Sequence, residues 1–452
     1  MLRIFRAFIP STTIGSLLSE AILIISCFLI ATARQEDDFF LFLFYDNGWL
    51  RILLVAATVM LGLYLNDLYS SFRIRSKVLL VQQVCLALGI TFLLQGLITY
   101  LNMDWRLNRS PMLVGSALVL VFLPLWRMFY AQVILNILGA ERLLFIGGNV
   151  LLGQIAAHLR EHPELNMRCV GYLADDAVPD ELAAERRLGS IVELKTLAQS
   201  IRPDRLVIGF SDRRQQLPVY DLLDLRLTGL RIEDATSLYE FTFRRVCLEG
   251  LHPSELVFGS QFWPGATVLY LQALYSFLLA LVSILVTSPL LLLIWMGLKA
   301  TSPGPAIFGR TRIGRGNRNF TLYKFRTMYS DPELRVTGAF TPDNDPRVTP
   351  FGKWLRRTRL DELPQLFNVL KGDMAIVGPR PERPEFVRIL AQQIPFYQQR
   401  QCVKPGITGL AQINHELEDA RMILEYDLYY VRNLSPALDI LILLHTVKMA
   451  FF

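Results

Sequence analysis

Two adjacent carboxylates in the C-terminal third of the chain, Asp361 and Glu362, are residue types suited to phosphoryl chemistry. Three arginines come just before them: Arg356, Arg357 and Arg359. Proline is favoured in the first turn of a helix, so Pro364 places the pair at or just before a helix N-terminus. There, the helix dipole and the arginines are expected to keep both carboxylates ionised at neutral pH.

Adjacent side chains point in different directions, so the two carboxylates are expected to have different roles. One could attack phosphorus while its neighbour holds Mg²⁺ on a diphosphate, because Mg²⁺ is commonly bound by one or two carboxylates plus substrate phosphates. The alternative is a solvated helix start with surface ion pairs. The two carboxylates alone do not decide between these interpretations.

The stretch from Thr301 to Ser330 carries positive charge and no acidic residue. Its basic residues are Arg310, Arg312, Arg315, Arg318, Lys324 and Arg326. A protein that transfers phosphoryl groups mainly positions them and stabilises their charge, and basic residues beside a carboxylate pair suit both tasks. The net charge of the whole chain is only +6 at pH 7, which favours a local anion site and a membrane surface over nucleic acid.

The elements that must position these residues begin with a membrane part, because 52% of the 452 residues are hydrophobic. Four apolar stretches have about the 20 residues that span a bilayer: Ile14–Ala33, Trp49–Leu68, Val78–Leu101 and Met112–Leu135. Arg73 and Arg75 separate the second from the third, whereas Glu36 and Asp37 separate the first from the second. Basic loops stay cytoplasmic, so residues 1–138 predict a four-helix transmembrane bundle with both ends inside. Arg127, within the fourth stretch, is expected to snorkel or pack and not to line an ion pathway.

Residues 139–262 have the composition of a soluble α/β domain. Arg142–Gly148, Cys169–Asp175 and Asp204–Phe210 are typical of buried strands, with helical patterns between them. Alternating strands and helices predict a Rossmann-like parallel sheet. The first turn, Gly147-Gly-Asn-Val-Leu-Leu-Gly153, lacks the G-x-G-x-x-G spacing of a dinucleotide site. A structural or regulatory domain is therefore favoured over nucleotide binding.

A long apolar run, Val268–Leu298, follows. As one straight helix of about 30 residues it would be about 45 Å long, beyond the roughly 30 Å hydrocarbon core. Ser288-Pro289 interrupts it, and proline kinks a helix. Basic residues flank both ends, Arg245 before and Lys299 after. Residues 263–299 therefore favour a re-entrant membrane helix broken at Ser288 and Pro289 over a fifth spanning helix.

Residues 300–452 are predicted to form a mixed α/β catalytic domain. Its tail from Pro436 is interrupted by Asp439, His445 and Lys448, which favours an interfacial helix on the inner leaflet over a spanning one. The five cysteines and five histidines of the chain are scattered, so neither a disulfide framework nor a Cys/His metal site is expected.

Six motifs cover about residues 300–414 almost without a gap. They are Ser302-Pro-Gly-Pro-Ala-Ile-Phe308, Tyr323-Lys-Phe-Arg-Thr-Met328, Asp345-Pro-Arg-Val-Thr349, Leu355–Met374, Val377-Gly-Pro-Arg-Pro-Glu382 and Lys404–Gln412. Through them the chain resembles the monotopic phosphoglycosyl transferases, the bacterial sugar transferases that start polysaccharide assembly. The membrane and Rossmann-like parts are similar to those of the family's long members, and the Ser288-Pro289 break matches its re-entrant helix.

The resemblance implies a two-step reaction on the cytoplasmic face of the bacterial inner membrane. Asp361 would attack the β-phosphorus of a UDP-sugar, releasing UMP and leaving a phosphosugar on the carboxylate. Polyprenyl (undecaprenyl) phosphate would then accept the phosphosugar, which initiates exopolysaccharide, capsule or O-antigen assembly. Glu362 would hold Mg²⁺. The substrate-binding residues implied are Lys324, Arg326, Arg356, Pro379, Arg380, Pro381 and Gln412, and a homodimer is implied as well.

Two other classes of protein would explain part of the sequence. A membrane-anchored nucleotide-sugar dehydratase would need G-x-G-x-x-G and a Tyr-x-x-x-Lys pair, and no tyrosine is followed four positions later by lysine. A scaffold or exporter component would explain the membrane part but not a charge-dense stretch with adjacent acidic residues. The transferase is therefore the favoured function.

Overall fold

The computed structural model of the chain describes residues 2–4, 7–9, 11–35, 38–66, 68–69, 77–134, 139–162, 165–175, 177–210, 218–251, 253–258, 263–329, 347–414 and 419–451. The chain divides into two compact units, one of residues 1–4 and 8–242 and the other of residues 5–7 and 243–452. Glu36, Asp37, Arg73, Arg75 and Asp345, which contributed to the sequence predictions, lie outside the described residues.

Long apolar helices form the N-terminal part of the first unit. They are α1 (Ser11–Ala33), α3 (Gly48–Leu65), α4 (Lys77–Leu101) and α5 (Arg109–Phe129), which continues as a π-helical turn, η2 (Tyr130–Ile134). Shorter elements are β1 (Leu2–Ile4), β2 (Ala7–Ile9), α2 (Phe39–Phe44) and the 3-10 turn η1 (Met103–Trp105). Each of the four predicted stretches overlaps a helix that is long and apolar enough to cross a membrane, although α3 ends at Leu65, three residues before the predicted end.

A buried ion pair joins two of these helices. Glu20 on α1 and Arg127 on α5 approach to 2.8 Å, and both side chains are almost fully buried. Arg127 also donates a hydrogen bond to the backbone oxygen of Leu68, and its guanidinium lies over the ring of Tyr69. A charge in apolar surroundings is costly unless it is paired. Arg127 therefore packs inside the helix group, with Glu20, which the sequence pattern did not single out, as its partner.

The rest of the first unit is a parallel five-stranded sheet with the order β5-β4-β3-β6-β7. Its strands are β3 (Glu141–Ile146), β4 (Met167–Leu173), β5 (Arg187–Gly189), β6 (Arg205–Ile208) and β7 (Arg231–Asp234). The first strand in sequence, β3, is central. The chain adds β4 and β5 on one side of it and then β6 and β7 on the other, as in Rossmann folds. The predicted parallel α/β domain is confirmed. Strands β5 and β7 were not predicted, because neither Arg187–Gly189 nor Arg231–Asp234 contains an apolar run.

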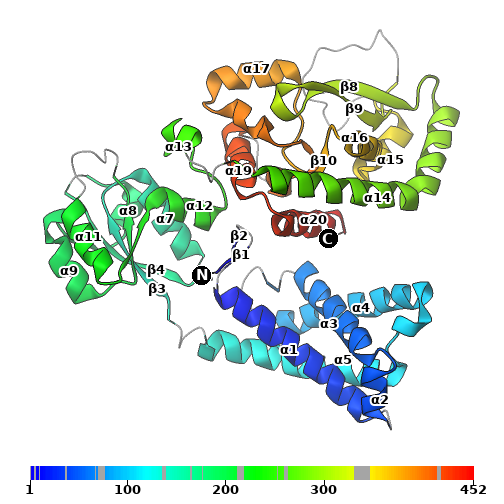
Figure 1. Cartoon of the computed structure of the whole chain (residues 1–452), viewed down its shortest axis with the longest axis horizontal. Coiled ribbons are helices and arrows are strands. Elements are labelled where there is room, and N and C mark those ends of the chain that lie inside the picture. The colour runs from blue at the N-terminus through cyan, green and yellow to red at the C-terminus, as the bar shows by residue number, and fades with distance from the viewer. Residues whose placement is uncertain are drawn as a thin grey trace. The chain divides into compact units, whose positions relative to one another are not determined.

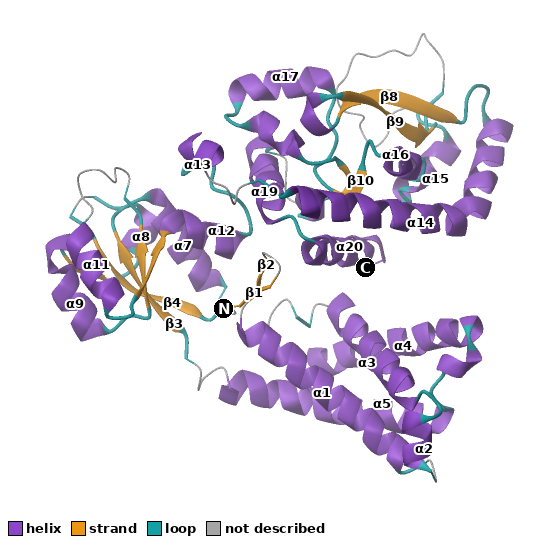
Figure 2. Cartoon of the chain, viewed as in Figure 1, coloured by secondary structure: helices purple, strands orange, loops and turns teal. Residues whose placement is uncertain are grey.

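Helices cover both faces of this sheet (Figure 2). They are α7 (Val150–Glu161), α8 (Asp180–Ala183), the 3-10 turn η4 (Ile191–Glu193), α9 (Leu194–Ile201), α11 (Val219–Leu227) and α12 (Ala235–Phe243). Side chains alternate along a strand, so Leu144 and Ile146 share one face and pack with Leu194 of α9 and Leu222 of α11. Both faces of β3 are apolar because both are covered.

The second unit contains the charged motifs. Its helices are α13 (Pro253–Phe258), α14 (Ala266–Thr301), α15 (Pro350–Arg357), α16 (Gln365–Lys371), α17 (Pro384–Gln393), α18 (Leu410–Ile413), α19 (Ala420–Asn433) and α20 (Pro436–Phe451). Strands β8 (Ile307–Ile313) and β9 (Asn319–Phe325) form an antiparallel hairpin through the turn η5 (Arg315–Asn317). Strands β10 (Ala375–Val377) and β11 (Gly406–Thr408) pair in parallel. The unit is thus mixed α/β, as predicted.

Helix α14 contains Pro289 and bends along its length (Figure 1). In its first half, the Gln272 side chain donates to the backbone oxygen of Val377 at 3.2 Å. In its second half, Leu298 packs with Leu355 of α15 and accepts a hydrogen bond from Arg326. Both halves of the helix therefore contact the same α/β domain. By length and composition α14 is also long enough to cross a membrane, so the re-entrant path stays a prediction.

Helix α20 is attached to this domain through a buried acid. Asp439 is 1% exposed, and it accepts hydrogen bonds from Tyr275, Gln272 and Tyr430. Burial raises the pKa of Asp439 to about 6, although these three donors oppose the shift. Asp439, which interrupts the apolar tail in the sequence, is thus part of the contact between α14, α19 and α20. Ile440 and Val447 of α20 remain exposed, as an interfacial helix requires.

Candidate active site

The carboxylate pair lies in a turn between two short helices. Helix α15 ends at Arg357, Arg359 has a left-handed backbone with φ +54°, and Leu360–Glu362 form the 3-10 turn η7. Pro364 then begins α16 as its N-cap. The prediction that the pair lies just before a helix is confirmed. The left-handed Arg359 reverses the chain between α15 and η7, which carries Asp361 and Glu362.

A lysine from the neighbouring strand holds Glu362. Lys324 on β9 places its Nζ 2.6 Å from Glu362 Oε1, and each side chain is 24% exposed. An ion pair of this kind is stronger than one in open water, because the local dielectric is lower. The ion pair of Glu362 is therefore partly buried, which favours the active-site interpretation over a solvated helix start.

The two carboxylates differ electrostatically. Burial raises the pKa of Asp361, and the nearby charge of Glu362 raises it further, while Lys324 and Arg356 only partly oppose this. Burial also acts to raise the pKa of Glu362, but Lys324, Arg380 and Arg359 outweigh it and hold that pKa below its usual range. The arginines act in the expected direction, since Arg356 lowers the pKa of Asp361 and Arg359 lowers that of Glu362, but burial outweighs this effect at Asp361. Asp361 is the more basic carboxylate of the two.

Several of the predicted residues line one pocket beside the pair. It is lined by Arg312, Leu322, Lys324, Glu362, Gln365, Arg380, Pro381, Gly406, Ile407 and Gln412. Five of these, Lys324, Glu362, Arg380, Pro381 and Gln412, were predicted site residues. They come from β9, η7, the loop after β10 and α18, so the fold gathers residues that are up to 88 positions apart. The pocket is strongly charged, with Lys324, Arg312 and Arg380 around one acid.

Close backbone contacts shape the loop that carries Arg380. Gly378 donates to the oxygen of Thr408 at 2.9 Å, and Gly406 donates to the oxygen of Pro379 at 3.0 Å. A Cβ on Gly406 would stand 2.1 Å from the nitrogen of Gly378, which no side chain tolerates. Glycine is therefore required where β11 meets the end of β10, and this contact fixes the start of the Pro379-Arg380-Pro381 loop.

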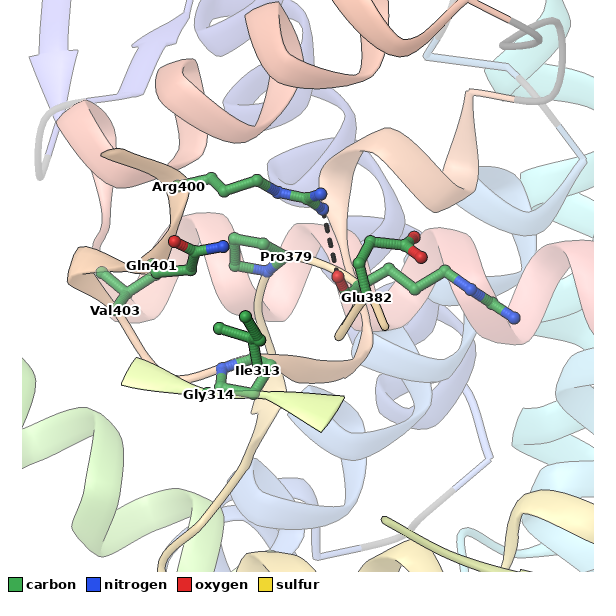
Figure 3. A pocket seen from close by; sticks show the side chains of 9 residues that line it. Ile313, Gly314, Pro379, Glu382, Arg400, Gln401 and Val403 are labelled. Atoms are coloured by element: carbon green, nitrogen blue, oxygen red, sulfur yellow. Dashed lines mark hydrogen bonds between the residues drawn. The ribbon is translucent and has the colours of Figure 1, made fainter. Parts of the chain in front are cut away.

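A buried arginine braces the same loop from the other side. Arg400, in the 3-10 turn η8 (Tyr397–Cys402), donates to the backbone oxygen of Arg380 at 3.1 Å and to the Tyr397 hydroxyl at 2.6 Å. Its guanidinium also lies 2.7 Å from Asp427 of α19, and both side chains are at most 3% exposed. Figure 3 shows Arg400 reaching over a small pocket lined in part by Pro379 and Glu382. Sequence reasoning missed this pair because no local motif links residues 400 and 427.

Four other predicted residues lie outside the lining of the main pocket. Asp361 is next to Glu362 in η7, and Pro379 lines the small pocket of Figure 3. Arg356 donates from Nε to the Thr327 hydroxyl at 2.8 Å and lowers the pKa of Asp361. Arg326 is buried, and its guanidinium donates to Ser302 and to the Pro305 oxygen. Arg326 thus holds the end of α14, and its contact with a substrate stays a prediction.

The carboxylate pair provides few protein ligands for Mg²⁺. Among the residues that the structure describes, no group of three or more His, Cys, Asp or Glu side chains is placed to hold a metal. Glu362 is held ionised, and Lys324 contacts one of its two oxygens. Mg²⁺ needs only one or two carboxylates when phosphates complete its coordination. The donor set therefore fits an ion shared with a bound diphosphate and does not fit a cage made by the protein alone.

Besides the pocket beside Glu362, the turn after β3 in the parallel sheet is a position at which Rossmann folds bind ligands. There the Asn149 side chain accepts from the Leu151 nitrogen and caps α7. Asp175, after β4, accepts from the Ser190 hydroxyl at 2.5 Å and from the Ile191 nitrogen. In dinucleotide-binding Rossmann folds the helix N-terminus takes the pyrophosphate and an acid takes the ribose. In this chain the N-terminus of α7 and the carboxylate of Asp175 both already have partners within the domain.

Comparison with known proteins places the pocket in a recognised segment. A family model described as "Bacterial sugar transferase" matches residues 268–452. A UDP-N-acetylgalactosamine-undecaprenyl-phosphate N-acetylgalactosaminephosphotransferase of Aeromonas hydrophila is 44% identical over 209 residues, which are 45% of this chain and 48% of the relative. UDP-glucose:undecaprenyl-phosphate glucose-1-phosphate transferases of Xanthomonas campestris pv. campestris and Escherichia coli (strain K12) are each 33% identical over 321 residues.

These matches extend beyond the catalytic domain. The match to the Xanthomonas relative covers 68% of this chain and 66% of the relative. The match to the Escherichia coli relative covers 69% of this chain and 68% of the relative. The chain therefore spans about half the length of the Aeromonas relative and about two thirds of the other two. The charged pocket lies wholly within the matched residues. The chain belongs to the bacterial sugar transferase family.

Proposed function

We propose that the chain transfers a sugar 1-phosphate from a UDP-sugar to undecaprenyl phosphate and so initiates a polysaccharide. The observation that carries the proposal is the pocket in which Lys324, Arg380 and Gln412 surround Glu362, next to Asp361. It lies in the segment matched by the sugar transferase family. Relatives over the same region are named for this transfer to undecaprenyl phosphate.

In the first step, an oxygen of Asp361 attacks the β-phosphorus of the donor. The bond from this phosphorus to the oxygen shared with the α-phosphate breaks, and UMP leaves with the bonding electrons. In the second step, a phosphate oxygen of the acceptor attacks the same phosphorus, and the bond to Asp361 breaks. The carboxylate is regenerated and the product is a polyprenyl diphosphate sugar. Two displacements let a soluble donor and a lipid acceptor react in turn.

The electrostatic difference between the two acids supports these roles. Burial makes Asp361 more basic, and a more basic, less hydrated carboxylate is a stronger nucleophile once it is ionised. Glu362 stays ionised at lower pH and is suited to hold a cation. Lys324 and Arg380 line the pocket, where they would bind phosphate oxygens and stabilise the charge that develops on the leaving UMP.

Mg²⁺, when bound at Glu362, would offset charge on the diphosphate. The chain's own residues position the reaction. Lys324 fixes the orientation of Glu362 by its 2.6 Å contact, and Arg400 fixes the backbone of Arg380. Pro379 and Pro381 restrict the loop on which Arg380 lies, because proline fixes φ. The uridine end of the donor would lie along this loop.

The apolar helix α14 supports a site at the membrane surface. Both of its halves contact the α/β domain, so a helix that enters the membrane and returns at Ser288-Pro289 would keep the pocket at one face. This face would be the cytoplasmic side of the bacterial inner membrane, where UDP-sugars are available. The basic flanks of the helix agree with that side.

The function is tested by UMP release. Purified chain, Mg²⁺ and undecaprenyl phosphate are incubated with UDP-glucose, UDP-galactose or UDP-N-acetylgalactosamine, the first and last of which appear in the names of the relatives. At least one donor is expected to yield UMP and a lipid-linked diphosphate sugar in equal amounts. Release of UDP, or no nucleotide product from any donor, would overturn the proposal.

A further inference from the structure

A second cavity of the catalytic domain lies at the turn between β8 and β9. It has a volume of about 580 Å³, and three basic side chains, Arg315, Arg318 and Lys404, line it together with one acid, Asp373. None of these four residues lines the pocket beside Glu362. The proposed reaction therefore leaves this basic cavity without a role.

Two of the cations of this cavity, Arg315 and Lys404, have defined contacts. Arg315 donates from Nε to the backbone oxygen of Cys402 at 3.1 Å. The ammonium of Lys404 lies beside Gly372, where a Cβ would stand 3.6 Å from it. Burial and the charge of Arg315 lower the pKa of Lys404, although Asp373 opposes them. Lys404 is partly buried and lies close enough to the exposed Arg315 to be repelled by it, and a bound anion would relieve this repulsion.

The cavity is distinct from the proposed reaction centre. Phe320 lines it, whereas Lys324, four residues further along β9, lines the pocket beside Glu362. Four strand residues span about 13 Å. Leu322 lies between them and is buried in the core. Arg312, the cross-strand partner of Phe320, lines the pocket beside Glu362, so the two cavities border each other at this pair. Arg315 and Arg318 lie beyond this border at the hairpin turn, farther along the strand from Lys324.

One wall of the cavity continues to the membrane helix. Phe320 belongs to the apolar cluster that contains Ala280 and Ile284 of α14. Leu281 and Leu285 of the same helix are exposed, and such side chains need a lipid environment. A basic cavity beside a membrane helix is the usual setting for an anionic lipid headgroup.

We propose that this cavity binds the headgroup of an anionic phospholipid, with its phosphate among Arg315, Arg318 and Lys404 and its acyl chains along α14. The lipid would seat the catalytic domain at the bilayer surface. This inference goes beyond the proposed transfer reaction and does not depend on it.

The test is lipid binding by the purified full chain in detergent, followed by native mass spectrometry with dioctanoyl phosphatidylglycerol and with dioctanoyl phosphatidylcholine. The wild type is expected to bind one phosphatidylglycerol in preference to phosphatidylcholine. The variant Arg315→Gln/Arg318→Gln is expected to lose about tenfold in affinity for phosphatidylglycerol. Arg388→Gln removes an exposed charge from α17 and serves as the matched control, with affinity unchanged.

Equal binding of the two lipids by the wild type, or unchanged affinity in the double variant, would overturn the proposal. Arg318→Gln alone, at an exposed turn position, gives the same readout if the double variant is unstable. Undecaprenyl phosphate is the competitor. If it displaces phosphatidylglycerol one for one, and the variants raise only the KM for undecaprenyl phosphate, then the site belongs to the acceptor and the phospholipid assignment is wrong. Binding is measured without turnover, so failure of the transfer reaction would not affect the result.

Discussion

Two regions of the molecule place helix N-termini and acids where a nucleotide could bind, and they differ in what those groups already contact. In the parallel sheet, Asn149 caps α7 and Asp175 is bound by Ser190 and Ile191. In the catalytic domain, Lys324 and Glu362 pair with each other, but together with Arg312 and Arg380 they line a small pocket in which positive charge is in excess. A group that is satisfied within its own domain stabilises the fold, whereas clustered charges facing a pocket are available to a ligand. Fold type alone would have pointed to the sheet.

The largest expected effect is a difference in activity between substitutions of the acid in each region, Asp361 and Asp175. Asp361→Asn removes the proposed nucleophile and is expected to lower UMP release by about 10⁴-fold or more. Asp175→Asn changes an acid that bonds only within the sheet domain, and activity is expected to stay within about twofold of wild type, with some loss of stability. Steady-state UMP release measures both. Comparable losses in the two variants would remove the distinction between the regions.

The next effect concerns the pocket lysine. Lys324→Gln is expected to lower kcat/KM by about 10²–10³-fold, as removal of a group that stabilises transition-state charge does. Lys324 lowers the pKa of both Asp361 and Glu362, so its loss raises both values. Activity needs ionised Asp361 and falls as the pH drops through its pKa.

The acid limb of the pH profile of kcat/KM should therefore move to higher pH in Lys324→Gln. Lys353→Gln, which changes an exposed residue of α15, is the control and should leave the limb in place. If the acid limb of the kcat/KM profile does not move in Lys324→Gln, then ionisation of Asp361 does not determine that limb.

A smaller effect is expected from the backbone contact beneath the pocket. Gly406→Ala would place a Cβ 2.1 Å from the Gly378 nitrogen and is expected to lower the free energy of unfolding by about 1–3 kcal/mol. Gly265→Ala has no atom within 4 Å of the new Cβ, so a change below about 1 kcal/mol is expected. Thermal unfolding of the two variants in detergent tests the difference. Equal stability would mean that the loop before Arg380 is less constrained than the contacts indicate.

The smallest expected effect is the difference between two ligands, UDP and NAD⁺, in how far each raises the unfolding temperature. UDP with Mg²⁺ is expected to raise the unfolding temperature by about 2–4 °C when it is near 100 times its Kd, and Lys324→Gln should abolish the rise. NAD⁺ is expected to shift the temperature by less than about 1 °C, because the sheet domain has already used its helix cap and its acid. A stabilisation by NAD⁺ that Asp175→Asn removes would assign a dinucleotide site to the sheet.

The sequence predicted those features that arise from local pattern. Apolar length predicted the long helices, buried apolar runs predicted strands β3, β4 and β6 of the sheet, and Pro364 predicted the helix start beside Asp361. The pair of Arg400 and Asp427 could not be predicted, because two residues 27 positions apart meet only through tertiary packing. The same holds for the burial that raises the pKa of Asp361, and for the internal partners of Asp175.

The central claim is that Asp361 carries the sugar phosphate between donor and acceptor. Intact-protein mass spectrometry after rapid mixing of the chain with Mg²⁺ and a donor, without undecaprenyl phosphate, tests it directly. The wild type is expected to gain the mass of one phosphosugar and to lose it again when undecaprenyl phosphate is added. Asp361→Asn should gain no mass under the same conditions. An adduct that persists in Asp361→Asn would place the nucleophile elsewhere and contradict the account.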